Sequence, residues 1–120
     1  MLLIFYLSSY PAPETAKAAP IYFSHVKVVH IIEYGVLSLL FYLGLSNTID
    51  AKSSKLAIYS VGLSTLYGIT DEIHQLFIPS RSASIYDVIT DLSGSSLFIF
   101  LLFMVLALKN IAKSRNNAIE

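Results

Sequence analysis

The chain has 120 residues, enough for one domain (1–120), and 55% of them are hydrophobic while 13% are charged. Ordinary soluble domains carry about 25% charged residues, so this composition favours a protein that lies in a membrane. The net charge of zero gives no indication of a basic nucleic-acid-binding surface. The absence of cysteine excludes disulfides, thiolate metal sites and cysteine nucleophiles.

The N-terminal segment predicts only part of a helix. Residues 1–7 are apolar, but Ser8, Ser9 and Pro11 interrupt a helix soon afterwards. A helical span needs about 20 apolar residues, so this segment is too short to cross a bilayer. We interpret residues 1–9 as the outer end of a first helix. A cleaved or partly inserted leader is the alternative, although no basic residue precedes the apolar stretch.

Three longer apolar segments predict full transmembrane helices over residues 26–45, 56–78 and 85–108. A helix of about 20 residues rises about 30 Å, the thickness of the hydrocarbon core. Pro79 should end the second helix, and Ser84 with Asp87 forms a capping-box-like start for the third. A soluble chain of this length could hardly bury three such helices. The predicted fold is therefore an all-α membrane bundle of three full helices and a partial fourth.

The basic residues predict the orientation of this bundle, because cytoplasmic segments carry an excess of lysine and arginine. The loop between the first two full helices and the basic tail (109–120) carry Lys52, Lys55, Lys109, Lys113 and Arg115. The opposite side carries Lys17, Lys27 and Arg81. This excess of five to three places the C-terminus in the cytoplasm and the loop with Arg81 outside.

Ionisable and polar residues of the three predicted helices meet at one membrane boundary. We call this set the polar layer; it consists of His30, Glu33, Tyr34, Asp71, Glu72, His74, Gln75, Asp87 and Asp91. Spacings of three or four residues place the members from each helix on one face. The small residues Ser60, Ser64 and Gly68 lead along one helix face toward the layer, which should therefore lie inside the bundle. Ionisable groups inside a membrane indicate function by default.

The polar layer contains more acidic than basic groups. Five of the eight acidic residues of the chain belong to it, and they face only Arg81, Lys27 and two histidines. Close carboxylates in a low-dielectric environment cannot all ionise without a counter-ion. The sequence therefore predicts protonated carboxyl groups, a bound cation, or compensation by Arg81 and charged histidines.

Four motifs follow one another in this part of the chain: H-x-x-E-Y from His30, D-E-x-H-Q from Asp71, F-x-P-x-R-x-x-S from Phe77 and D-V-x-x-D-x-x-G from Asp87. Their order and spacing over residues 26–94 resemble the signature of VanZ-like membrane proteins. Ser80 stands where glycine often follows the proline, and the first helix is shorter than the family pattern. The resemblance implies a protein of the bacterial cytoplasmic membrane, in a family named after an accessory of resistance to the glycopeptide teicoplanin. It implies no reaction.

The residue types of the polar layer fit several roles. The candidates for a general base or proton shuttle are Glu33, Asp71, Glu72 and His74. The candidates for binding a divalent metal such as Zn²⁺, Mn²⁺ or Fe²⁺ are His30, Glu33, Asp71 and His74. The candidates for binding a ligand are His30, Tyr34, Gln75, Arg81, Asp87 and Asp91. The alternative is a hydrogen-bonded network that only fixes the register of the helices.

Three classes of function are compatible with this sequence. The first is an envelope-associated membrane protein whose extracytoplasmic pocket binds a cell-wall precursor, a glycopeptide or a lipid headgroup. The second is a membrane-embedded hydrolase, dependent on metal or acid–base chemistry, that acts on cell-wall or lipid-linked substrates. The third is a small transporter, which would require a homo-oligomer because three helices enclose little space. In each class the lipid bilayer is a partner and nucleic acid is not.

Overall fold

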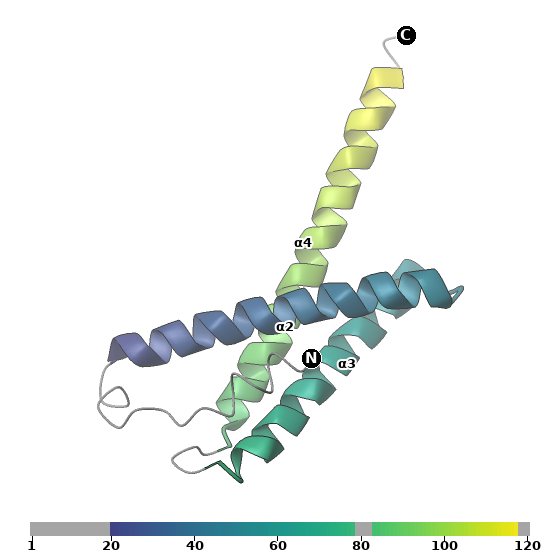
Figure 1. Cartoon of the computed structure of the whole chain (residues 1–120). Coiled ribbons are helices and arrows are strands. Elements are labelled where there is room, and N and C mark those ends of the chain that lie inside the picture. Colours follow the sequence, from purple (N-terminus) through teal and green to yellow (C-terminus); the bar gives the residue numbers. More distant parts are fainter. Residues whose placement is uncertain (1–19, 79–82, 118–120) are drawn as a thin grey trace.

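The computed structural model of the chain describes residues 20–78 and 83–117, with side chains from Lys27 onward. This described part is all helical and consists of α2 (Pro20–Thr48), α3 (Ser53–Gln75) and α4 (Ile85–Asn117). Each helix packs against the other two, and α4 continues beyond the bundle toward the C-terminus (Figure 1). The all-α fold class is confirmed for these residues. The partial helix over residues 1–9 and the side chain of Arg81 lie outside them.

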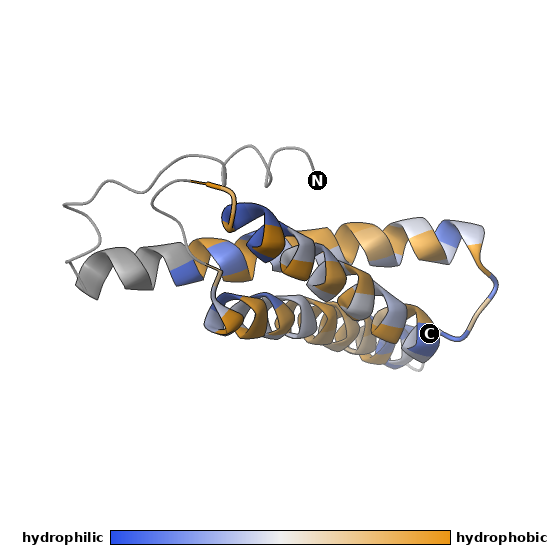
Figure 2. Cartoon of the chain, turned by 90° about the horizontal axis from the view of Figure 1, so that it is seen from below, coloured by the Kyte–Doolittle hydropathy of each residue, from blue (hydrophilic) through white to orange (hydrophobic). Residues whose placement is uncertain are grey.

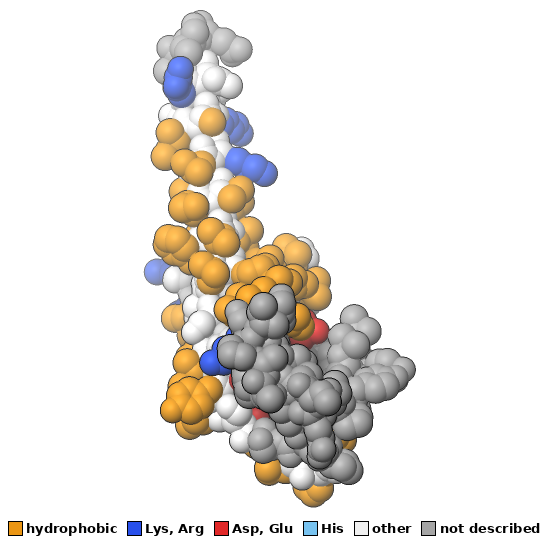
Figure 3. Space-filling view, turned by 90° about the vertical axis from the view of Figure 1, so that its left-hand side faces the viewer, with side chains coloured by type: hydrophobic (Ala, Val, Ile, Leu, Met, Phe, Trp, Pro, Cys, Tyr) orange, Lys and Arg blue, Asp and Glu red, His pale blue; other side chains and the backbone are white. Residues whose placement is uncertain are grey.

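Both α2 and α4 are longer than the sequence predicts. α2 begins at Pro20 instead of near residue 26. Proline is favoured at the first helical position, because its fixed φ suits the helix and its missing N–H needs no partner there. α4 continues to Asn117 instead of residue 108, so residues 109–117 of the basic tail form the last turns of this helix. Lysine and arginine side chains gather at that end, where the helix dipole favours positive charge (Figure 3).

α3 ends at Gln75, three residues before the predicted end of the helix at residue 78. The backbone N–H groups of Phe77 and Ile78 donate to the carbonyls of His74 and Gln75 at 3.0 and 3.1 Å. These bonds span three residues instead of four, so the chain tightens into a turn here. Pro79 follows, and a proline disfavours the helical conformation of the residue before it. The turn toward α4 therefore starts directly behind the polar residues of α3.

A glycine lets α2 and α4 approach each other closely. A Cβ atom built on Gly94 of α4 would lie 2.5 Å from the carbonyl oxygen and 2.7 Å from the Cα atom of Ile31 on α2. No side chain fits at this distance, because real Cβ atoms do not come so close to backbone atoms. Helix packing through small residues is typical of membrane bundles, where close backbone approach replaces the hydrophobic effect.

Buried serines connect all three helices next to this contact. The hydroxyl of Ser64 on α3 donates to the carbonyl oxygen of Tyr34 on α2 at 3.0 Å. The Oγ atom of Ser95 on α4 lies 2.9 Å from Ser64 Oγ and 3.2 Å from the same carbonyl. Ser38 of α2 donates to the carbonyl of Ser95 at 3.1 Å. The small-residue face predicted on α3 is buried, and hydrogen bonds between helices accompany it.

The interior of the bundle is more polar than its exterior. Among the described residues, eight polar or charged residues are buried against five hydrophobic ones. Large hydrophobic side chains lie outside instead: Ile58 is 69% exposed and Phe100 is 63% exposed. In Figure 2, hydrophobic residues recur along all three helices. A soluble protein shows the opposite distribution, so this arrangement is suited to a lipid environment.

Two of the described helices are long and apolar enough to cross a membrane, Lys27–Thr48 within α2 and Ile85–Asn117. α3 does not meet the same criterion. Its 23 residues include the buried serines and the carboxylates of Asp71 and Glu72, which lower its mean hydropathy. Two of the three predicted full spans are therefore candidate spans by length and composition, and the third stays a prediction.

Replacing Gly94 with alanine tests the close contact between α2 and α4. The added methyl group must push the Ile31 backbone away, and such overpacking costs about 1–3 kcal/mol of stability. Thermal unfolding of the detergent-purified protein, followed by circular dichroism, should show a lower midpoint for Gly94→Ala. Gly62→Ala is the control, because a Cβ on Gly62 meets nothing within 4 Å. An equal midpoint for both variants would contradict the contact.

Candidate functional site

The polar layer lies where the end of α3 and the beginning of α4 meet the middle of α2. Asp71 and Glu72 belong to the last two turns of α3, and Asp87 belongs to the first turn of α4. Because α2 begins at Pro20, His30 lies well inside this helix instead of in its first turns. α2 therefore continues past the layer.

A hydrogen bond between His30 of α2 and Asp91 of α4 is the central contact of the polar layer. The Nδ1 atom of His30 lies 2.9 Å from Oδ1 of Asp91. Because a carboxylate oxygen only accepts, we take Nδ1–H as the donor. Asp91 is fully buried, and the side chain of His30 is 12% exposed. The ring of His30 also stacks on that of Tyr34, with centroids 5.9 Å apart. The imidazole is thus fixed in orientation, and its Nε2 atom is the nitrogen left for other chemistry.

The second oxygen of Asp91 lies over a glycine of α3. A Cβ atom built on Gly68 would be 2.5 Å from Asp91 Oδ2 and 3.2 Å from Cε1 of Tyr34. Any side chain at this position would collide with the carboxylate. Gly68 therefore lets Asp91 and Tyr34 meet at the surface of α3, and all three helices contribute to this point.

The carboxylate of Glu72 joins the end of α3 to the start of α4. Its Oε2 atom accepts a hydrogen bond of 2.6 Å from the backbone N–H of Ser84. The carbonyl of Ser84 in turn accepts from the N–H of Asp87 at 3.0 Å, as in the first turn of a helix. The capping box predicted for this start assigns the Ser84 N–H to Asp87, the third residue of the helix. Glu72 of the neighbouring helix accepts this bond instead, and its negative charge is favourable at a helix N-terminus.

A further buried contact orients Asp71. The side-chain amide of Gln75, one turn later on α3, donates to Asp71 Oδ2 at 3.1 Å. Both side chains are buried, so α3 turns them inward as the four-residue spacing predicts. This bond fits a supporting role for Gln75.

Glu33 and Asp87 interact electrostatically with these contacts. Glu33 is half-buried and interacts electrostatically with His30, Asp71 and Asp91. Asp87 is half-buried too, and it acts on His30 and Glu72. Glu33 and Asp87 therefore form one electrostatic unit with the contacts above, while Arg81 lies outside the described residues. Whether they bind or catalyse stays a prediction.

The donor set predicted for a divalent metal is not gathered around one point. Within residues 20–78 and 83–117, no group of three or more His, Asp or Glu side chains is arranged to hold a metal ion. His30 turns its Nδ1 atom to Asp91, which the sequence did not include among the metal ligands. Metal binding by His30, Glu33, Asp71 and His74 stays a prediction.

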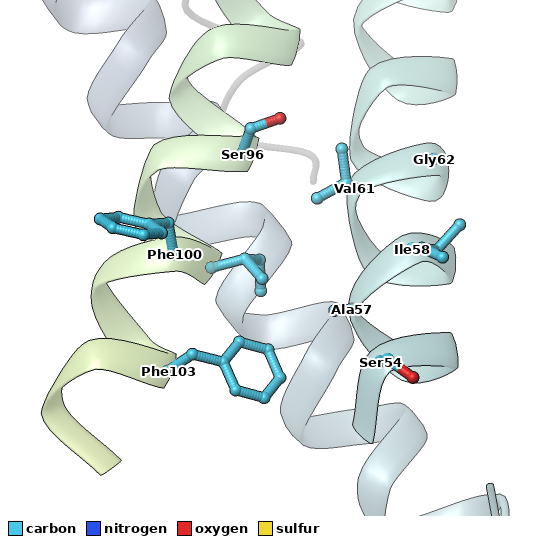
Figure 4. A pocket seen from close by; sticks show the side chains of 9 residues that line it. Ser54, Ala57, Ile58, Val61, Gly62, Ser96, Phe100 and Phe103 are labelled. Atoms are coloured by element: carbon cyan, nitrogen blue, oxygen red, sulfur yellow. The ribbon is translucent and has the colours of Figure 1, made fainter. Parts of the chain in front are cut away.

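A groove in the outer surface lies between α3 and α4, away from the polar layer. It has a volume of about 740 Å³ and is lined by residues within 54–62 of α3 and 96–103 of α4. Its lining is almost wholly apolar, and Val61 and Phe103 point into the space between the helices (Figure 4). The groove contains no ionisable side chain, so the polar layer is the candidate functional site.

A double-mutant cycle measures the contact between His30 and Asp91. Removing one partner of a buried pair costs about 3–5 kcal/mol, because the other partner keeps its desolvation penalty. The losses for His30→Ala and Asp91→Ala should therefore not add, and the coupling energy should be about 1–3 kcal/mol in unfolding experiments. The control pairs His30→Ala with Asp50→Ala, since Asp50 is exposed in the loop before α3. Additive losses for His30 and Asp91 would show that the pair is absent.

Replacing Glu72 with glutamine tests the connection between α3 and α4. A hydrogen bond to a neutral acceptor is about half as strong as one to a carboxylate, so the first turn of α4 should open more often. Hydrogen exchange should then become faster at the amides of residues 84–88, while exchange in the middle of α4 stays as it is. Asp50→Asn serves as the control for loss of one negative charge. Unchanged exchange at residue 84 would contradict the contact.

Comparison with known proteins agrees with the motifs of the polar layer. The VanZ/LLP1 family model matches residues 1–107, which includes every residue of the layer. No curated protein and no solved structure matches the chain. Together with two helices able to cross a membrane, the family match indicates a membrane protein. The chain belongs to the VanZ/LLP1 family.

Proposed function

We propose that this protein crosses the bacterial cytoplasmic membrane several times and binds a polar ligand of the cell envelope in its polar layer. The layer opens on the extracytoplasmic side in this proposal, and the basic end of α4 lies in the cytoplasm. The family name connects such proteins with glycopeptide resistance, so the proposed ligands are a cell-wall precursor, a glycopeptide or a lipid headgroup.

Three features support α3 as a third membrane span. Its 23 residues rise about 35 Å, enough for the hydrocarbon core. Its outward face carries exposed apolar residues along the whole length, among them Ile58, Leu66 and Ile73. Its carboxylates at positions 71 and 72 are buried against the other helices instead of facing outward. With three spans, the loop before α3 and the loop before α4 lie on opposite sides.

The buried pair of His30 and Asp91 is the observation that carries the proposal. Burial of two ionisable groups contributes little net stability compared with apolar packing of the same volume. Stability alone therefore gives a weak reason for this pair in the centre of a membrane bundle, and ionisable groups in such places usually serve binding or transport. The pair engages one imidazole nitrogen of His30, and Glu33 and Glu72 lie within electrostatic range of this side chain.

The charges of the layer favour a ligand with cationic or hydrogen-bond-donating groups. Its described part carries five carboxylates and two imidazoles. Such acceptors suit the amino and hydroxyl groups of a cell-wall precursor, a glycopeptide or a headgroup. Arg81 is the proposed contact for an anionic group of the same ligand, because its planar fork matches carboxylates and phosphates.

Teicoplanin susceptibility of a bacterial host tests this function. Expression of the parent chain should raise the inhibitory concentration several-fold, and Asp91→Asn and His30→Gln should remove this effect because they remove the carboxylate charge and the imidazole of the central pair. Asp50→Asn should keep it, since this carboxylate lies outside the polar layer. Membrane levels of all variants are compared by immunoblot. Full resistance with both variants of the pair, or none with the parent chain, would contradict the proposal.

The geometry of the pair also supports hydrolysis as a second candidate function. A carboxylate that orients an imidazole through Nδ1 leaves Nε2 in place to accept a proton from water or a hydroxyl group. Purified protein with a lipid-linked cell-wall precursor tests this activity. Turnover by the parent chain should fall about 10²–10⁴-fold in His30→Gln, the usual contribution of a general base. Absence of turnover in the parent chain would leave ligand binding as the function.

A further inference from the structure

Three buried oxygen atoms of the polar layer lack a hydrogen-bond partner among the described residues. They are Oδ2 of Asp91, the hydroxyl oxygen of Tyr34 and Oε1 of Glu72. A buried polar atom without a partner costs about 1–3 kcal/mol, and more if it is charged. Tyr34 and Asp91 are both fully buried, so bulk water does not reach them. These atoms indicate that the layer accommodates something besides its own side chains.

Two of these oxygens belong to side chains that meet over Gly68. The position of a Cβ on Gly68 is 2.5 Å from Asp91 Oδ2 and 3.2 Å from Tyr34 Cε1, the ring carbon next to the one that bears the hydroxyl. Asp91 is also the charge that acts most strongly on the hydroxyl of Tyr34. Glu72 follows Gly68 by one helical turn and interacts electrostatically with Asp91.

The charge at this point is negative. Besides Asp91, the carboxylates of Asp71 and Glu33 act on the hydroxyl of Tyr34. The His30 imidazole hydrogen-bonds one of these carboxylates, through the Oδ1 atom of Asp91. The oxygen on the other side of that carboxylate faces Gly68 and Tyr34, which bring no positive charge. In a low-dielectric interior, a compact positive charge would relieve the repulsion among these groups.

We propose that the polar layer binds a small hard cation between Oδ2 of Asp91 and the hydroxyl oxygen of Tyr34, with Oε1 of Glu72 as the third donor. Carboxylate and hydroxyl oxygens are donors that Na⁺, Mg²⁺, Ca²⁺ and Mn²⁺ accept. This inference rests on the proposed function, because it treats the polar layer as a ligand site. It adds that a small cation is bound there in the resting protein. The donor set differs from the histidine-containing one that the sequence predicts.

Thermal unfolding without any envelope ligand tests this cation site. The protein is purified in detergent, treated with chelator and dialysed into choline chloride. NaCl, MgCl₂, CaCl₂ or MnCl₂ then replaces choline chloride at constant ionic strength. At least one of these salts should raise the unfolding midpoint by several degrees and in a saturable way, since a ligand that binds only the folded state stabilises it. Comparison of NaCl with the three divalent salts shows which cation binds. Equal midpoints in all five salts would overturn the proposal.

Two variants separate specific binding from a general salt effect. Tyr34→Phe removes one oxygen and keeps the ring that stacks on His30, and Asp91→Asn removes one charge. Both should lose the midpoint shift, whereas Tyr59→Phe and Asp50→Asn, at exposed positions, should keep it. A shift of unchanged size in Tyr34→Phe and Asp91→Asn would overturn the site. If Asp91→Asn does not fold, Tyr34→Phe decides.

The outcomes of this experiment and of the resistance test are independent. If the protein binds a cation but does not change glycopeptide susceptibility, the proposed function is wrong and the cation site stands. If resistance depends on Asp91 but none of the four metal salts changes the unfolding midpoint, the proposed function stands and the cation site is wrong.

Discussion

The contact between His30 and Asp91 organises the polar half of the bundle. It joins α2 to α4 through a hydrogen bond of 2.9 Å, and it turns the other oxygen of Asp91 toward α3. The position of this carboxylate in turn requires Gly68, because a Cβ there would collide with it. Two ionisable groups in a buried place are stable only with good geometry and further hydrogen bonds. The close helix packing around them supplies that geometry.

This packing rests on small residues rather than on a large apolar core. Gly94 brings the backbones of α2 and α4 together, and Ser64 and Ser95 share the carbonyl oxygen of Tyr34. In lipid, the apolar outer faces gain nothing by turning inward, so van der Waals contact and interhelical hydrogen bonds hold the helices together. The same inward faces end in carboxylates and imidazoles. Close packing and the candidate site are therefore parts of one surface on each helix.

Periodicity in the sequence predicts what depends on neighbours along one helix. Long apolar runs predict the three helices, and the spacing of Ser60, Ser64 and Gly68 predicts the buried face of α3. Contacts between helices depend on the register and crossing geometry of the helices, and the spacing of residues along one helix does not determine either. The pairs His30–Asp91 and Glu72–Ser84 therefore emerge only from the fold, although their members stand out in the sequence. Helix ends are set by single bonds and prolines, and they differ from the prediction by several residues.

The central claim is that three helices cross the membrane and open the polar layer to the outside. Because the chain contains no cysteine, single cysteines at the exposed positions Asn47 and Ala83 report the side of each loop without background. Labelling of intact cells with a membrane-impermeant maleimide is the most direct measurement. The account predicts that Ala83→Cys reacts in intact cells and that Asn47→Cys reacts only after permeabilisation. Reaction of both, or of Asn47→Cys alone, would contradict it.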